Sequence, residues 1–264
     1  MKLLLQRWEV WIFLFGIVIV NASFVSGIAF EVLPKNLYSM GRFLLLGAFL
    51  FAVVFLSRGV GGLLELVKPM LVWRVSPLWY LLAIIWAAMN CLIILAAKGY
   101  LSNAGLSYIQ MNFDVVARPE IIRTIFVSSL IGEIVWIGYA VQKLSTRFTP
   151  YVSALIVGCF WTAWWFPMVY FHIGVIPGLP LIGLLFNQTG VAVMCAFFYI
   201  RTGSALVVLT MQMAFNNAIL IFPVAPTSGG MPTYWSFAIF YFLTALVVFA
   251  AFGSRPLFVK DSST

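Results

Sequence analysis

The chain has 264 residues, of which 64% are hydrophobic and only 8% are charged, and its mean hydropathy is +1.08. Soluble domains are roughly half apolar, so this composition excludes a soluble globular protein and indicates an integral membrane protein. The formal net charge of +8 is typical of basic flanks that face anionic lipid headgroups, and it gives no reason to expect a nucleic-acid partner.

Eight segments are apolar enough to cross a bilayer as helices, since a hydrocarbon core about 30 Å thick needs about 20 apolar residues. In chain order, we expect these spans at 10–30, 42–57, 79–98, 121–142, 151–172, 178–199, 204–223 and 234–252. Two further stretches, 59–75 and 99–120, are expected at the membrane surface, as interfacial segments or loops. The predicted fold class is an all-α polytopic membrane helical bundle with about eight transmembrane helices.

The basic residues predict the orientation, because Lys and Arg collect on the cytoplasmic side. If the N-terminus lies inside, the inside segments carry ten Lys and Arg residues and the outside segments carry five. Both termini are therefore expected in the cytoplasm.

One acid stands out among the buried polar residues. Glu133, in "IGEIVWIGYAVQKL", is the only acid well inside a predicted span, where a charge costs roughly 2.5–3.5 kcal/mol by insertion scales. Burial without a partner favours its protonated form. Gln212 and Asn216, in "MQMAFNNAIL", are four residues apart and share a helix face. We expect this pair to hydrogen-bond to the acid.

The sequence lacks the residues that a catalytic metal site or a covalent nucleophile with a histidine base would need. His172 is the only histidine, whereas catalytic zinc usually takes several His and carboxylate ligands. Cys91, Cys159 and Cys195 show no paired spacing. On a continuous helix, His172 would lie two turns, about 10 Å, beyond Trp165. The sequence therefore predicts no metal site and no cofactor.

Three segments carry a family resemblance: "GEIVWIGYAVQKL", "ALIVGCFWTAWWFPMVYF" and "YIRTGSALVVLTMQMAFNN". In order, spacing and flanking residues they resemble the three-motif core of the CPBP family, over about 120–222. This family comprises membrane-embedded CAAX-type proteases and bacteriocin-processing or self-immunity proteins, also called abortive-infection proteins. The resemblance implies a membrane fold in which a glutamate activates water for peptide hydrolysis, and histidine and asparagine stabilise the oxyanion.

The family's polar site residues fall on six positions of this sequence. Two are retained, as Glu133 and Asn216. Four are replaced: Gly132 stands at the first glutamate, Ile137 at the arginine, and Trp165 and Gln212 at the two histidines.

These replacements predict impaired catalysis. Without an arginine at Ile137, no neighbour in the sequence favours the ionised form of Glu133, so the acid should be a weak, mostly protonated base. Loss of one oxyanion donor alone costs ~10²–10³ in rate in well-studied enzymes. The equivalent catalytic positions are Glu133, Gln212 and Asn216, and we expect little or no activity from them.

Three functions follow as hypotheses. The first is a catalytically impaired family member that binds another membrane protein or a peptide, as a regulator, a scaffold or a bacteriocin self-immunity factor. The second is an active intramembrane glutamate-dependent endopeptidase, in which Glu133, Gln212 and Asn216 converge on a water-filled cavity. The third is a small proton-coupled permease with Glu133 as proton relay, although internal repeats typical of transporters are missing. Glu133 could also serve packing alone.

The organisation and location follow from the same observations. We expect one membrane domain over 1–264: N-terminal spans and loops (1–120), a CPBP-like core (121–222), and a last span with a cytoplasmic tail (223–264). By the resemblance, the protein belongs in a prokaryotic plasma membrane, surrounded by lipids. The sequence leaves its oligomeric state open.

Overall fold

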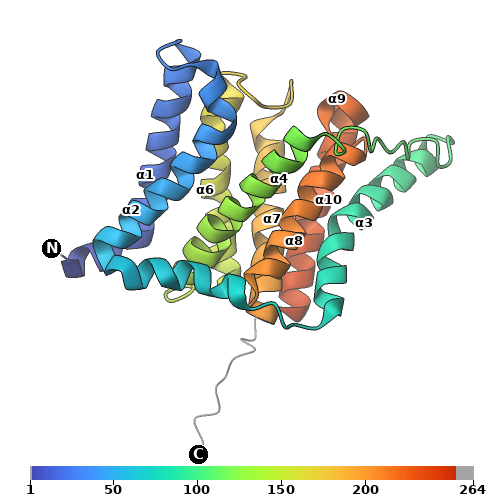
Figure 1. The fold of residues 1–264 in the computed structure, drawn as a ribbon. Coiled ribbons are helices and arrows are strands. Elements are labelled where there is room, and N and C mark those ends of the chain that lie inside the picture. The colour runs from blue at the N-terminus through green and yellow to red at the C-terminus, as the bar shows by residue number, and fades with distance from the viewer. Residues whose placement is uncertain (1, 254–264) are drawn as a thin grey trace, which may run out of the picture.

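The computed structural model describes residues 2–253, and the side chains from residue 5 onward, as a bundle of helices without any strand in this range (Figure 1). Eight helical segments of the described chain are long and apolar enough to span a membrane. The long helices are α1 (Lys2–Ala29), α2 (Tyr38–Val67), α3 (Pro77–Leu101), α4 (Pro119–Gly132), α6 (Pro150–Tyr170), α7 (Leu181–Thr202), α8 (Ala205–Ile221) and α10 (Met231–Phe252). The shorter ones are η1 (Lys35–Leu37), η2 (Lys68–Leu71), η3 (Glu133–Val141), α5 (Gln142–Leu144) and α9 (Pro226–Gly229).

The predicted fold class is confirmed, and each predicted span corresponds to one of these segments. The fourth span is composite, because α4, η3 and α5 follow one another without a break. The predicted tail at 254–264 lies outside the described residues.

Helix α2 is much longer than the predicted span 42–57, because it contains a bend. Gly59 has φ 70° and ψ −160°, a conformation that a residue with a side chain adopts only with strain. Beyond this glycine the chain runs along one face of the bundle, across its base in Figure 1. Val60 and Leu64 are exposed on this part. It falls within the stretch 59–75 that we expected at the membrane surface.

The two faces of the bundle carry different segments. The start of α1, the end of α10 and the stretches 58–76 and 143–149 lie on one face, called here the termini face (Figure 1). The loops 30–37, 102–118, 171–180 and 222–230 lie on the opposite face. The assignment of the termini face to the cytoplasm stays a prediction.

Helix α7 forms the centre of the bundle. Every residue from Asn187 to Phe198 is buried, and from Gly190 onward this stretch is apolar around its whole circumference, as a helix enclosed on all sides requires. At the periphery, α10 buries Tyr241 and Ala245 but exposes Leu243 and Val247. Peripheral helices therefore present an apolar outer surface, as a lipid environment requires.

Candidate functional site

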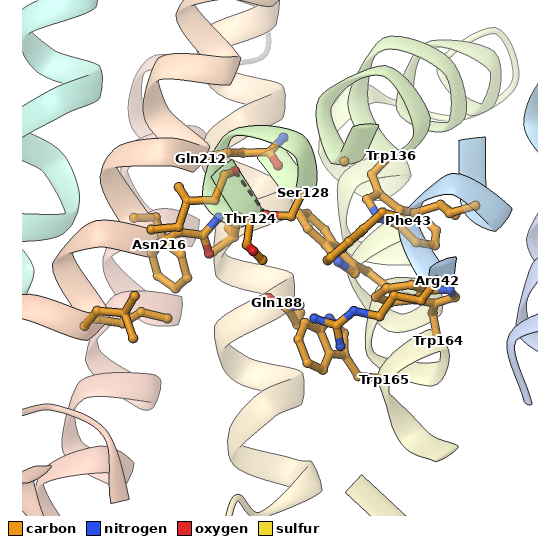
Figure 2. A pocket seen from close by; sticks show the side chains of 18 residues that line it. Arg42, Phe43, Thr124, Ser128, Trp136, Trp164, Trp165, Gln188, Gln212 and Asn216 are labelled. Atoms are coloured by element: carbon orange, nitrogen blue, oxygen red, sulfur yellow. Dashed lines mark hydrogen bonds between the residues drawn. The ribbon is translucent and has the colours of Figure 1, made fainter. Parts of the chain in front are cut away.

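A cavity of about 250 Å³ lies among α2, α4, α6, α7 and α8 (Figure 2). Its walls are mainly aromatic and aliphatic, with a small polar set. The polar lining residues are Arg42, Thr124, Ser128, Gln188, Gln212 and Asn216. A second cavity, of about 170 Å³, shares Trp165, Gln188 and Asn216 with the first and reaches the loops 174–179 and 224–225. Together they form a largely apolar hollow with a few convergent polar groups, which is typical of ligand sites.

The structure brings Gln212 and Asn216 together in this cavity, as their spacing predicted. It does not bring Glu133 with them. The Glu133 side chain is only 1% exposed and lines neither of the two cavities. Its carboxyl lies beside Gly138, where an added Cβ would be 3.3 Å from Oε1. The three expected catalytic side chains are therefore divided between two environments.

The reason for this division is local. Residues 133–141 form a π-helix, η3, in which the hydrogen bonds run from residue i to i+5. The residue one turn beyond Glu133 is thus Gly138, which leaves room for the carboxyl. Ile137, at the family's arginine position, is fully buried. The spacing of an ordinary α-helix would place the Glu133 side chain on a different face, so the sequence alone could not predict where its carboxyl lies.

The expected hydrogen bonds from Glu133 to Gln212 and Asn216 are absent from the described part of the chain. Asn216 instead donates from Nδ2 to Ser129 Oγ at 3.1 Å, which links α8 to α4. Glu133 Oε1 has no hydrogen-bond partner within residues 5–253, and Glu133 forms no ion pair there. Within the described residues the acid thus has no ion pair, and its Oε1 has no hydrogen-bond donor.

Gly132 and Gln212 fit one another at the wall of the cavity. A Cβ added at Gly132 would lie 2.9 Å from Gln212 Oε1, closer than real Cβ atoms come. A glutamate at position 132, as in the family pattern, would therefore collide with Gln212 as it is placed here. The absence of a side chain at Gly132 therefore leaves room for the Gln212 amide.

Trp165, which the resemblance aligns with a family histidine, takes part in an aromatic cluster. Its ring lies 5.7 Å from that of Trp164, in a perpendicular arrangement. The guanidinium carbon of Arg42 lies 5.1 Å from the Trp165 ring centre. Trp165 therefore contacts a cation from α2, and it forms no hydrogen bond through Nε1 within the described residues.

Arg42 is a site residue that sequence reasoning missed. It is the first residue of the predicted span 42–57, yet it is only 8% exposed and lines the larger of these two cavities. Its Nη1 donates to the Tyr38 hydroxyl and approaches Met168 Sδ. Figure 2 shows it extending across the cavity wall toward Trp165. No local sequence signal indicated this placement, because Met168 is 126 residues away.

A second buried acid was also missed. Glu9 is 1% exposed, although we expected Glu133 to be the only acid well inside a span. Glu9 accepts a hydrogen bond from Ser57 and pairs with Arg58 at 3.2 Å and with Lys143 at 3.9 Å. These partners come from α2 and α5, near the termini face. Glu9 is thus compensated where Glu133 is not.

His172 does not continue α6 as expected, because that helix ends at Tyr170. His172 follows it in a left-handed conformation, with φ 54°, and its side chain is exposed. Within residues 2–253, no three His, Cys, Asp or Glu side chains are grouped so that they could hold a metal ion.

Comparison with known proteins identifies the central segment. Residues 115–219 match the family model described as Type II CAAX prenyl endopeptidase Rce1-like. No curated protein sequence matches the chain significantly. The matched segment runs from the loop before α4 into α8, and it coincides with the stretch 120–222 in which the resemblance was found. The protein is thus a multi-pass membrane protein that carries, at residues 115–219, an Rce1-like domain of the CPBP family.

Proposed function

We propose that this protein is a catalytically impaired Rce1-like membrane protein, which binds another membrane protein or a peptide without cutting it. One observation carries the proposal. The carboxyl of Glu133 lies against Gly138 and lines neither cavity, whereas Gln212 and Asn216 line the larger one. A general base must reach the proton it abstracts within about 2.6–3.2 Å, or through one water. Glu133 is not placed to activate a water beside Gln212 and Asn216.

The surroundings of Glu133 support the same conclusion. A buried carboxyl without a cation or a hydrogen-bond donor is stabilised in its neutral form, and a neutral carboxyl cannot accept the proton of a nucleophilic water. Trp165 fills the position of one histidine and contacts Arg42. The site therefore lacks both an activated base and an imidazole donor.

The remaining polar groups suit binding. Gln188, Gln212 and Asn216 present amides to a mainly apolar cavity, and amides both donate to and accept from peptide groups. A peptide or a membrane protein segment could thus be held there. We place the protein in a prokaryotic plasma membrane, where such binding would make it a regulator, a scaffold or a bacteriocin self-immunity factor.

A cleavage and binding experiment tests this function. The full-length protein in lipid nanodiscs is incubated with a prenylated CAAX peptide, the substrate class named by the family description. Products are measured by mass spectrometry and binding by fluorescence anisotropy. Glu133→Gln is the test variant, and Glu120→Gln, an exposed acid in the first turn of α4, is the matched control.

We expect the wild type and both variants to bind the peptide without cleaving it. Cleavage by the wild type and by Glu120→Gln, but not by Glu133→Gln, would contradict the proposal and establish the alternative of an active endopeptidase.

A further inference from the structure

Among the residues that the structure describes, Arg42 is the only charged one that lines either cavity. Its side chain is more than nine-tenths buried, yet it has no carboxylate partner among residues 5–253. Buried arginines are almost always paired, because an uncompensated charge in an apolar interior is costly. The cavity therefore has a net positive wall.

Aromatic rings hold the guanidinium in place. Its carbon lies 4.5 Å from the ring centre of Phe43, 4.6 Å from Tyr38, 5.1 Å from Trp165 and 6.0 Å from Trp164. Such cation–π contacts stabilise a cation without neutralising it. The guanidinium is thus pre-positioned and keeps its charge available.

Several side chains that line the cavity carry a buried N–H group without an acceptor. Within the described chain, Arg42 Nε, Trp164 Nε1, Trp165 Nε1 and Gln212 Nε2 are buried and have no hydrogen-bond partner. All four belong to lining residues and all four are donors. A lining with one cation, unpaired N–H groups and no acid favours an anion over a cation.

The depth of Arg42 indicates where such an anion would come from. Arg42 follows Tyr38, the first residue of α2, by four positions, which corresponds to about 6 Å along the helix axis. The headgroup layer on each side of a bilayer is also roughly 5–7 Å thick. The predicted second span begins at residue 42, so Arg42 is expected at the boundary between the hydrocarbon core and the headgroup layer.

We propose that the Arg42 end of the cavity binds the phosphate of a membrane phospholipid, with the acyl chains along the apolar walls. A phosphate offers more acceptor oxygens to these donors than the terminal carboxylate of a peptide does. Leu46, Ile125 and Ile219 provide apolar lining for the chains. The cavity is the one that the proposed function assigns to a peptide, so a lipid and a peptide would compete for it, but lipid binding is expected whether or not a peptide binds.

A lipid-binding measurement tests this site. The purified full-length protein in neutral detergent is titrated with dioleoyl phosphatidic acid, and bound lipid is counted by native mass spectrometry. Dioleoylglycerol, which has the same chains without the phosphate, and inorganic phosphate, which lacks the chains, are the two comparison ligands. Arg42→Gln removes the charge, Arg42→Lys keeps it, and Arg123→Gln changes an exposed arginine on α4 as the matched control.

The expected result is saturable binding of one phosphatidic acid, with much weaker binding of dioleoylglycerol. Loss of the charged hydrogen bonds in Arg42→Gln should raise the dissociation constant about 10–100-fold. The dissociation constant of Arg42→Lys should lie between those of the wild type and Arg42→Gln, and that of Arg123→Gln should equal the wild-type value. Inorganic phosphate should compete only weakly.

Three outcomes would overturn the proposal. The first is equal affinity for phosphatidic acid and dioleoylglycerol in the wild type, a comparison that needs no variant to fold. The second is wild-type affinity for phosphatidic acid in Arg42→Gln. The third is inorganic phosphate, or a peptide with a free carboxylate, binding as tightly as phosphatidic acid, which would assign the site to another anion.

Discussion

Replacing Gly132 by alanine should reveal how closely the altered site is packed. The added Cβ would lie 2.9 Å from Gln212 Oε1, whereas ordinary contacts begin at 3.4 Å. One of the two groups must therefore move by about 0.5 Å, from 3.4 minus 2.9. Gln212 is only 3% exposed, so its amide cannot turn freely into solvent.

The expected cost combines two opposing effects. Overpacking of a buried site costs about 1–3 kcal/mol, and replacing a helical glycine by alanine returns about 0.5–1 kcal/mol. Because the nearest atom is the end of the flexible Gln212 side chain, Gly132→Ala should destabilise the protein by no more than about 2.5 kcal/mol. In a Gln212→Ala background the collision is removed, and the same substitution should become stabilising by about 0.5–1 kcal/mol.

Reversible unfolding in mixed micelles, followed by tryptophan fluorescence, measures these free energies. Gly61→Ala is the control, because nothing lies within 4 Å of a Cβ added there. It should show only the gain in helix stability. An equal effect of Gly132→Ala with and without the Gln212 side chain would refute the steric coupling.

Two further substitutions test the bundle around the site, by the same unfolding measurement. Gly158→Ala should destabilise by about 1–3 kcal/mol, because the added Cβ would lie 2.5 Å from the Thr189 Cα and α6 must move away from α7; unchanged stability would contradict this close approach. Glu9→Gln should lower the free energy of unfolding by about 1–3 kcal/mol. This loss is smaller than for a fully buried pair, because Arg58 keeps its ion pair with Glu65 at 2.6 Å. An unchanged free energy of unfolding would show that the Glu9–Arg58 pair contributes little.

The spans could be predicted because apolar length is a local property of the sequence. The pairing of Gln212 and Asn216 on one face was also predictable, since α8 is an ordinary helix. The resemblance found at 120–222 was confirmed by the family match at 115–219. These features need no knowledge of how the helices pack.

The surroundings of the charged residues could not be predicted in this way. Arg42 and Glu9 lie near the ends of their spans, where a basic or acidic residue is usually a solvated flank. Their burial depends on contacts with helices that are distant in the sequence. The position of the Glu133 carboxyl depends on the π-helical turn of η3, and no residue pattern in 133–141 distinguishes this turn from an ordinary α-helix.

The state of Glu133 is tested most directly by infrared difference spectroscopy between the wild type and Glu133→Gln, in H₂O and D₂O. Other carboxyl groups, including Glu9, cancel in the difference. The isolation of Glu133 predicts a band from a protonated carboxyl that shifts only slowly after transfer to D₂O. A carboxylate band, or a carboxyl band that exchanges at once, would mean that Glu133 is ionised or hydrated and would contradict an impaired catalytic site.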